Sequence, residues 1–195
     1  MLYGKLKRYM LRFLKEKLAE NLYYHDLGHT LEVLNNISEI SRYEKVTKYE
    51  LVLLKTAALL HDSGFTLKYQ DHESESQKLA REILPQFKYT YVEINTICNL
   101  IEVTRIPQKP TNLMERIISD ADLLYLGTDR FVDTAEKLFQ ELKFYSLIST
   151  RKQWNKIQKD FLNVHHFHTE YCIENYNLPK AENLQKVIEE LNNPN

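Results

Sequence analysis

The sequence predicts an all-α protein, a compact helical bundle with additional C-terminal helices. Its four glycines and five prolines in 195 residues are few, and its abundance of Leu, Ile, Lys and Glu is typical of helices joined by short connections. Apolar residues recur at intervals of three and four, which is the helical period. The hydrophobic fraction of 43% and charged fraction of 27% are ordinary for a globular chain, so we expect one domain over residues 1–195.

Charge and cysteine content exclude several classes of function. A formal net charge of -1 gives no overall attraction to nucleic acid or to anionic membranes. No stretch approaches the roughly 18 apolar residues that would span a bilayer. The only cysteines, Cys98 and Cys172, suit a reducing compartment. We therefore expect a soluble, cytoplasmic protein with neither a membrane nor a nucleic acid as partner.

The first predicted helix, about Leu2–Leu22, carries an apolar stripe that indicates packing. The second covers Tyr23–Ile40 and places His25 and His29 one turn apart, so that both side chains share a face. Taken alone, this pair fits a metal or catalytic site and a pair of hydrogen-bonded histidines at a helix start about equally well.

The helix predicted over Leu51–Gly64 is apolar in nearly every direction around its axis, which indicates a central helix packed on all sides. It ends in His61-Asp62, and a buried imidazole and carboxylate require a charged or hydrogen-bonded partner. A divalent cation would meet that need, and the partial negative charge of a helix C-terminus would favour it further. Gly64 is expected to end the helix.

The next stretch offers possible phosphate contacts. A loop reaches Asp71, and His72 stands at the entrance of the following helix, where it either caps the helix or contacts a phosphate or a second metal. After a helix over Tyr89–Val103, the loop with Arg105 and Lys109 supplies two cations. Cations in a loop suit phosphate binding, although a solvated loop is the commoner explanation.

Two acids lie in the apolar helix predicted over Leu113–Gly127. Asp120 and Asp122 stand among Ile and Leu residues, where a carboxylate requires a partner. One of them is therefore predicted to bind a metal ion.

The remainder, residues 129–191, reads as three or four helices, the last of them beginning after Pro179. Its three histidines, His165, His166 and His168, form the run His-His-Phe-His. We interpret them as packing or surface residues rather than as a second metal site.

Acids and imidazoles thus gather at several predicted helix ends and faces. They are His25, His29, His61, Asp62, His72, Asp120 and Asp122. Imidazole and carboxylate without thiolate form the ligand set of Zn, Mn, Fe, Ni or Co in a site that keeps positions open for water. Such an ion activates water and polarises a phosphoryl oxygen, which is the chemistry of phosphoester hydrolysis.

The order His29, His61-Asp62, Asp122 resembles that of the HD-domain superfamily of metal-dependent phosphohydrolases. The resemblance, strongest to small stand-alone bacterial HD proteins, spans about residues 23–144 and includes Tyr24-His25, His29-Thr30, Ala58-Leu59-Leu60-His61-Asp62-Ser63-Gly64, His72-Glu73 and Asp120-Ala121-Asp122-Leu123. It implies an all-α HD bundle with its site between helices, on which the C-terminal helices over residues 145–195 pack.

By the same resemblance, His29, His61, Asp62 and Asp122 are the metal ligands. Asp122 is preferred to Asp120 because Ala121-Asp122-Leu123 matches the Ala-Asp-Leu form around the fourth ligand of related hydrolases, and Asp120 would orient a ligand instead. The cofactor is expected to be one tightly bound divalent ion, Mn, Zn, Fe, Ni, Co or Mg.

The resemblance also implies catalytic roles for His25, as the proton donor to the leaving oxygen, and for Asp62. His72 matches a position that meets phosphate or a second metal in some members, and we count Arg105 and Lys109 with it as phosphate-binding residues. Many members carry a further histidine where this chain has Thr104, which favours one ion over two.

The expected function is hydrolysis of a phosphomonoester or phosphodiester, and the expected substrates are nucleotide-like small molecules. The alternative is a non-catalytic, metal-containing HD module that binds a nucleotide as a sensor or serves as a scaffold. A metallopeptidase, indicated by the spacing of His25 and His29, is disfavoured because Asp26 replaces the Glu of that motif and Gly28 weakens the helix. A second copy of this chain, in a homodimer, is a further possible partner.

Overall fold

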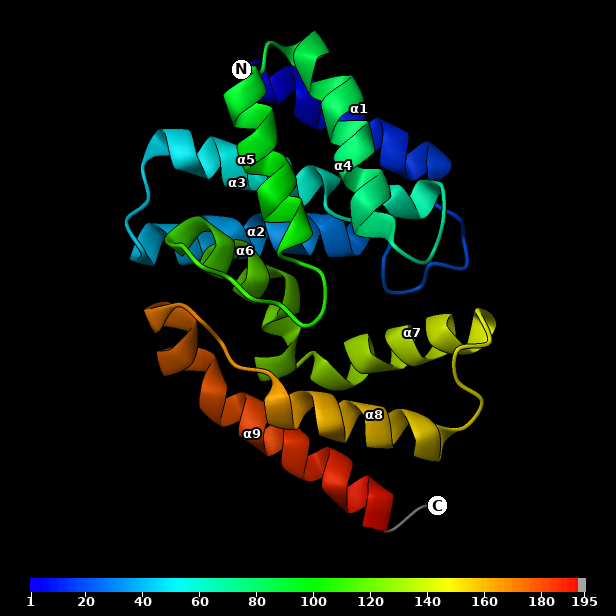
Figure 1. The fold of residues 1–195 in the computed structure, drawn as a ribbon. Coiled ribbons are helices and arrows are strands. Elements are labelled where there is room, and N and C mark those ends of the chain that lie inside the picture. The colour runs from blue at the N-terminus through cyan, green and yellow to red at the C-terminus, as the bar shows by residue number, and fades with distance from the viewer. Residues whose placement is uncertain (193–195) are drawn as a thin grey trace.

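The computed structural model describes residues 1–192, and every regular element in that range is a helix (Figure 1). This confirms the all-α prediction. The α-helices are α1 (Tyr3–Lys17), α2 (Leu27–Tyr43), α3 (Lys48–Leu60), α4 (His72–Ile83), α5 (Tyr91–Glu102), α6 (Leu113–Leu123), α7 (Phe131–Phe144), α8 (Arg151–Val164) and α9 (Glu170–Asn192). Short 3₁₀ helices, η1 (Ser63–Thr66), η2 (Leu84–Phe87) and η3 (Leu124–Gly127), extend the chain after α3, α4 and α6.

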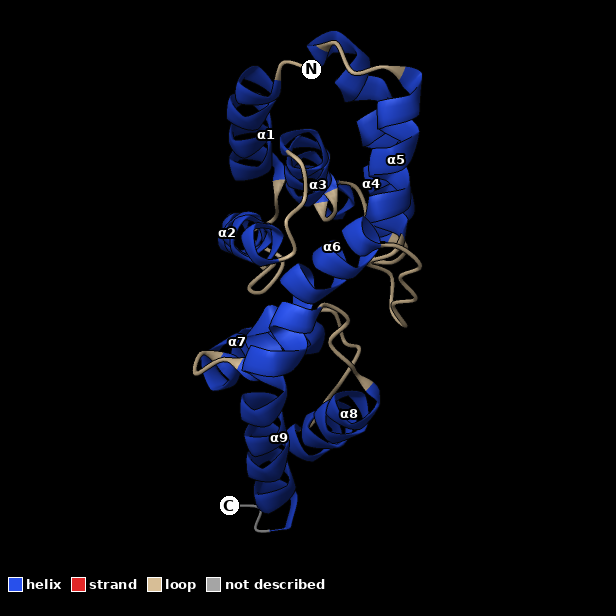
Figure 2. Ribbon diagram, turned by 90° about the vertical axis from the view of Figure 1, so that its left-hand side faces the viewer, coloured by secondary structure: helices blue, strands red, loops and turns tan. Residues whose placement is uncertain are grey.

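The helices form two groups. Helices α1 to α6 make one body, and α7, α8 and α9 pack beneath it (Figure 1). In the view turned by 90° the molecule is long and narrow, with α6 near the level where the two groups meet (Figure 2). Helix α9 packs against η3 and α2 at this junction. A single domain over residues 1–195 stays a prediction, and residues 193–195 lie outside the described part of the chain.

Helix α3 is central, as its apolar sequence predicts. It packs against α1, α2, α4, α5 and α6, and Leu54 and Leu60 have no exposed surface. A capping box fixes its start, because Thr47 accepts a hydrogen bond from the backbone N–H of Glu50 while the Glu50 carboxylate accepts one from the N–H of Thr47. The helix end that carries His61 is therefore held from several sides.

Helix α2 starts later than the sequence predicts. It begins at Leu27, because the Asp26 side chain caps it by accepting a hydrogen bond of 2.8 Å from the backbone N–H of His29. His25 therefore precedes the helix, and the prediction that His25 and His29 share one helical face is wrong. The helical spacing that a metallopeptidase motif requires is absent for the same reason.

Gly64 does not stop α3 in the way predicted. The helix ends at Leu60, and Gly64 lies inside η1 without a positive φ. A Cβ atom at Gly64 would stand 1.9 Å from the carbonyl oxygen of His72. The glycine is required because the start of α4 approaches the chain after His61 this closely.

Helix α9 is continuous where two helices were predicted. Pro179 lies inside it and removes one backbone hydrogen bond. Packing on both sides of the proline offsets this loss, since Cys172 and Val187 are both buried. The amide of Asn183 also donates hydrogen bonds of 3.0 and 3.1 Å to the carbonyl oxygens of Leu126 and Thr128. In residues 1–192 no helix is both long and apolar enough to cross a membrane.

Candidate metal centre

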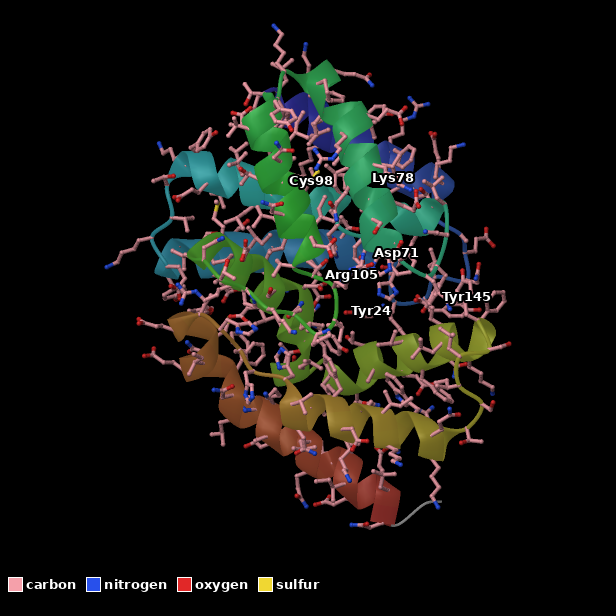
Figure 3. All side chains as sticks on the ribbon, viewed as in Figure 1. Tyr24, Asp71, Lys78, Cys98, Arg105 and Tyr145 are labelled. Atoms are coloured by element: carbon pink, nitrogen blue, oxygen red, sulfur yellow. The ribbon has the colours of Figure 1, made fainter. Side chains whose placement is uncertain are left out.

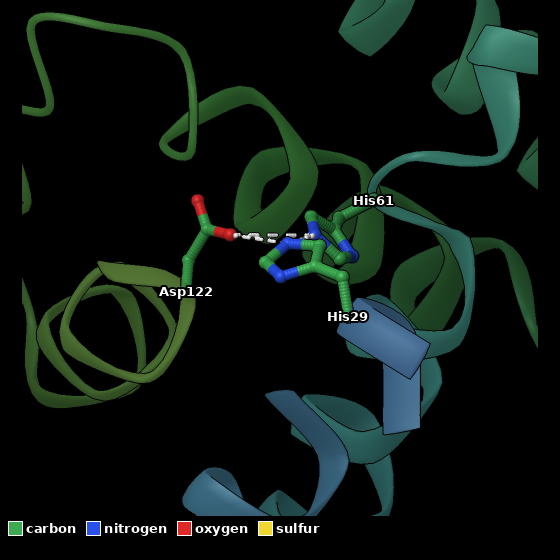
Figure 4. A group of neighbouring side chains, drawn as sticks. All are labelled: His29, His61 and Asp122. Carbon is green, nitrogen blue, oxygen red and sulfur yellow. Dashed lines mark hydrogen bonds and ion pairs between the residues drawn. The ribbon is translucent and has the colours of Figure 1, made fainter. Parts of the chain in front are cut away.

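Three helices each bring one side chain to the same point. His29 lies in the first turn of α2, His61 caps the end of α3, and Asp122 lies near the end of α6. The two Nε2 atoms and one carboxylate oxygen lie within 4.8 Å of one another (Figure 4). This cluster could hold a metal ion.

The distances fit coordination around one ion. Ligand atoms that lie about 2.1 Å from a metal at tetrahedral or octahedral angles are about 3.0–3.4 Å apart. The Nε2 atoms of His29 and His61 are 3.3 Å apart, and Asp122 Oδ1 lies 3.1 Å from the former and 3.4 Å from the latter. All three separations fall within that range.

Hydrogen bonds fix the orientation of His61. Its Nδ1 lies 2.9 Å from the carbonyl oxygen of Ala58, so Nδ1 carries an N–H and Nε2 is the ring nitrogen that faces the cluster. The hydroxyl of Ser76 donates a hydrogen bond of 2.6 Å to the carbonyl oxygen of His61 and accepts one of 2.8 Å from the N–H of Gly64. Helix α4 thereby clamps the turn that carries His61 and Asp62.

Asp62 completes the donor set. Its Oδ2 atom lies 3.1 Å from Nε2 of His61 and 3.4 Å from Nε2 of His29, yet it is buried and has no hydrogen-bond partner among residues 1–192. Burial alone would raise the pKa of this carboxyl, but the adjacent His61 imidazole holds it well below its usual range. A buried, ionised and unpartnered oxygen between two imidazoles fits a divalent cation.

Asp120 and Asp122, two residues apart in α6, have different partners. Asp120 is fully buried and accepts hydrogen bonds from the backbone N–H groups of His168 and Thr169, at 2.9 and 2.8 Å, and from the Thr169 hydroxyl at 2.7 Å. Asp122 instead faces the imidazoles, which lower its pKa to about 2 against the effect of burial. Asp120 thus ties α6 to the segment before α9 and is absent from the cluster.

A family model of the HD domain matches residues 23–126, more than half of the chain. The chain belongs to the HD-domain family. An uncharacterized protein of Clostridium beijerinckii is 33% identical over 76 residues, which covers 37% of this chain and 48% of that protein. The match therefore spans about half the length of that relative.

Two solved structures share the fold. A predicted HD superfamily hydrolase from an uncultured Thermotogales bacterium is 24% identical, with a TM-score of 0.59 and coverage of 95% of this chain and 89% of that chain. Bacillus subtilis YpgQ, solved in complex with ADP, is 19% identical, with a TM-score of 0.66 and coverage of 100% and 98%. Both likenesses extend beyond the HD match into the C-terminal helices.

His72 lies beside the HD cluster, at the start of α4. Its Nε2 atom is 3.5 Å from Oδ1 of Asp62, and its ring stacks on Phe65 with centroids 3.8 Å apart. Thr104 lines the same cavity and donates a hydrogen bond to the carbonyl oxygen of Ile101. His72 therefore lies on the Asp62 side of the cluster, and its phosphate contact stays a prediction.

Sequence reasoning missed Glu141, which lies in α7 beyond the HD match. It has no exposed surface, pairs with Nδ1 of His25 and accepts hydrogen bonds of 2.9 and 3.0 Å from the backbone N–H groups of Tyr24 and His25. The Tyr69 hydroxyl donates a fourth, of 3.0 Å. The sequence does contain a signal for Glu141. It is an acidic residue three positions after Leu138, on the apolar face of a predicted helix.

Arg105 and Lys109 do not join the cluster. The Arg105 guanidinium lies 2.8 Å from Asp71, 3.3 Å from Glu73 and 3.0 Å from Glu102, and Figure 3 shows it beside Asp71. Lys109 lines a separate surface hollow. Neither residue lines the cavity next to the imidazoles. The geometry does not favour their predicted phosphate contacts, because the charge of Arg105 is already matched by three acids.

A cavity of about 290 Å³ opens beside the cluster, lined by His25, Asp62, His72 and Asp122 on one side and by residues of α7 and α8 on the other. A larger cavity of about 590 Å³ lies between α7, α8 and α9, but no histidine or aspartate lines it. The smaller cavity is therefore the one in which a bound ligand would contact the donor set.

Proposed function

We propose that this chain is a metal-dependent hydrolase of a phosphomonoester or phosphodiester, with a nucleotide-like small molecule as substrate. The observation that carries the proposal is the unpartnered, buried Oδ2 of Asp62, between the Nε2 atoms of His29 and His61 and beside a cavity. In this proposal His29, His61, Asp62 and Asp122 hold one divalent ion. Bound there, the ion would lower the pKa of a water molecule and polarise a phosphoryl oxygen.

His25 is proposed to supply the proton that the leaving oxygen requires. Its Nδ1 is engaged by Glu141, so Nε2 is the ring nitrogen left for a ligand in the cavity that His25 lines. The carboxylate of Glu141 fixes the orientation of the ring through Nδ1, as a positioned general acid requires. His72, on the other side of Asp62, is proposed to contact the phosphoryl group.

Two further observations support a nucleotide-like substrate. Bacillus subtilis YpgQ, which shares the fold over the whole chain, was solved in complex with ADP. The cavity of this chain, at about 290 Å³, is near the lower end of the roughly 300–1,000 Å³ of small-molecule sites. A small phosphate ester fits this size.

The test combines metal analysis with a phosphoester panel. Wild type, Asp62→Ala and the exposed control Asp160→Ala are purified without chelator, analysed for metal and assayed on phosphomonoesters and phosphodiesters. We expect about one ion per chain and metal-dependent hydrolysis in wild type and control, with both lost in Asp62→Ala. Absence of metal from the reconstituted wild type would overturn the ligand assignment.

The variant His25→Asn distinguishes a hydrolase from a sensor or scaffold. Because His25 is proposed to act on the leaving oxygen and not on the ion, a hydrolase should retain its metal in this variant and lose about 100-fold or more in turnover. A wild-type protein that binds metal and nucleotide but cleaves no phosphoester would contradict the hydrolase and favour the sensor.

A further inference from the structure

Helices α7, α8 and α9 enclose the larger cavity of about 590 Å³, which none of the proposed metal ligands lines. Helix α8 packs closely along α9, whereas α7 packs against η3 and stands apart from both. Protein interiors contain few voids larger than a water molecule, and small-molecule sites measure roughly 300–1,000 Å³. The space between these three helices therefore has the dimensions of a binding site rather than of a packing defect.

The floor of this larger cavity is apolar. Phe131, Trp154 and Val187, one from each helix, line it and are each 4% exposed. Val132 also lines the cavity but is 54% exposed, so the cavity opens to solvent there. A ligand with an apolar body would remove that body from water against two aromatic rings and an aliphatic side chain, which favours binding.

Charged residues surround this apolar floor. Three basic and two acidic residues line the cavity, which leaves the lining with a net charge of +1. Arg151 forms an ion pair with Glu136. The second acid, Glu190, accepts a hydrogen bond of 3.0 Å from the amide of Asn155. Both acids therefore already have a partner within the wall of the cavity.

Lys152 and Lys186 are the two cations that remain for a ligand. Neither forms an ion pair with an acid of residues 1–192, and the Lys186 ammonium donates a hydrogen bond of 3.0 Å to a side-chain amide oxygen. The cavity beside the cluster is opposite in charge, because Asp62, Glu73 and Asp122 line it and no Lys or Arg does so. In the metal-free chain an anion is therefore attracted to the larger cavity and repelled from the smaller one.

We propose that the cavity between α7, α8 and α9 is a second binding site, for an amphipathic organic anion with one acidic group and an apolar ring system. The ring system packs on Phe131, Trp154 and Val187, and the acidic group pairs with Lys152 and Lys186. The site lies outside the HD match. It takes its ligand whether or not a metal ion occupies the cluster, so it does not rest on the proposed hydrolase.

Trp154 reports occupancy directly, because it lines the cavity and is the only tryptophan of the chain. The full chain in chelator is titrated with anilinonaphthalene sulfonate, an aromatic anion, and with phenylnaphthylamine, which has the same rings without the sulfonate. We expect the anion to quench the tryptophan fluorescence at about one molecule per chain and to bind about tenfold or more tightly than the neutral compound. Equal affinity for the two compounds would overturn the proposal.

Charge-removing variants test the two lysines. Lys152→Gln and Lys186→Gln should each weaken binding of the sulfonate about three- to tenfold, because each removes one cation from the site. Both should leave the affinity for phenylnaphthylamine unchanged. Lys5→Gln, an exposed position on α1, is the matched control and should bind the sulfonate as the wild type does. Lysine variants indistinguishable from this control would contradict the assignment of the acidic group.

A second pair of variants locates the probe, because Phe131, Trp154 and Gln158 line both cavities. Val132 lines only the larger cavity and Ile157 only the smaller one, and the two side chains are 54% and 43% exposed. A carboxylate at either position should leave the melting temperature close to that of the wild type. Val132→Glu should weaken sulfonate binding about tenfold or more, and Ile157→Glu should not. The reverse result would place the anion beside the cluster and overturn the second site.

Discussion

Helix α6 serves two regions of the molecule with the same type of side chain. Toward the C-terminal segment, Asp120 is enclosed by two backbone N–H groups and a hydroxyl. Toward the body of α1 to α5, Asp122 meets two imidazoles and accepts no backbone hydrogen bond from residues 1–192. Asp120 is fully buried and the Asp122 side chain is 12% exposed, so both carboxylates are largely removed from water and differ mainly in their partners. Backbone donors that saturate Asp120 indicate a structural anchor, and the two imidazoles that face Asp122 indicate a possible metal ligand.

The strongest test of this contrast is Asp122→Ala. It removes one of the four proposed ligands, and we expect metal affinity to fall by more than the roughly 10–100-fold that loss of an outer-shell partner causes. The metal-free protein should unfold close to the wild-type midpoint, because no backbone group loses a partner. Elemental analysis and metal titration measure the first effect, and thermal melts in chelator the second.

Asp120→Ala should give the opposite result. It leaves the N–H groups of His168 and Thr169 buried without an acceptor, which costs about 3–5 kcal/mol in the free energy of unfolding. For a chain of this size the melting temperature should fall by about 6–20 °C. Metal content per folded chain should stay at the wild-type level. Loss of metal with unchanged melting would reverse the assignments of Asp120 and Asp122.

Glu141 extends the comparison, because α7 reaches across from the C-terminal group to hold His25. In Glu141→Gln the metal should remain, and kcat for an alkyl phosphoester should fall about 10–100-fold because the His25 ring loses the carboxylate that orients it. The kcat for a nitrophenyl ester should fall less, because its leaving group needs little protonation. Glu182→Gln, an exposed control in α9, should show neither effect.

An equal loss of kcat for both esters in Glu141→Gln would contradict the proton-donor role of His25. Loss of metal in this variant would instead show that Glu141 supports the cluster itself. The comparison of the two esters is therefore more informative than the rate of either one alone.

The sequence predicted the half of the site that lies in the HD match. His61-Asp62 and the pair Asp120 and Asp122 were candidates because they stand at an end or within an apolar helix, where a charged group needs a partner, and the resemblance joined them with His29 into one predicted ligand set. The preference for Asp122 over Asp120 came from resemblance. Only the structure supplies the physical reason, since the donors to Asp120 arrive from Thr169, almost fifty residues later.

The main features that the sequence could not predict are contacts between residues far apart in the chain. The pairing of His25 with Glu141 joins residues 116 positions apart, and no local pattern encodes it. The helix start at Leu27 depended on Asp26 as a cap, a local signal that was read as part of a possible motif instead. Arg105 was assigned to phosphate on charge alone, while its partners Asp71 and Glu73 come from another helix start.

The smallest expected effect concerns acid stability in the C-terminal region, at His165. Burial, with the neighbouring Lys180, lowers the pKa of His165 from 6.5 to about 3. The unfolded chain therefore binds a proton that the folded chain does not between pH 6.5 and about 3, and stability falls as the pH falls through this window. From pH 7 to pH 6 the contribution is about 0.7 kcal/mol.

His165→Gln should remove that contribution, so that urea midpoints at pH 7 and pH 6 lie closer together than in the wild type. His166→Gln, an exposed control next to it, should retain the wild-type difference. Because His165 lies near the segment that Asp120 anchors, the variant tests whether this region limits stability in acid. An unchanged pH dependence in His165→Gln would assign the acid sensitivity to other groups, among them His168, whose pKa burial also lowers.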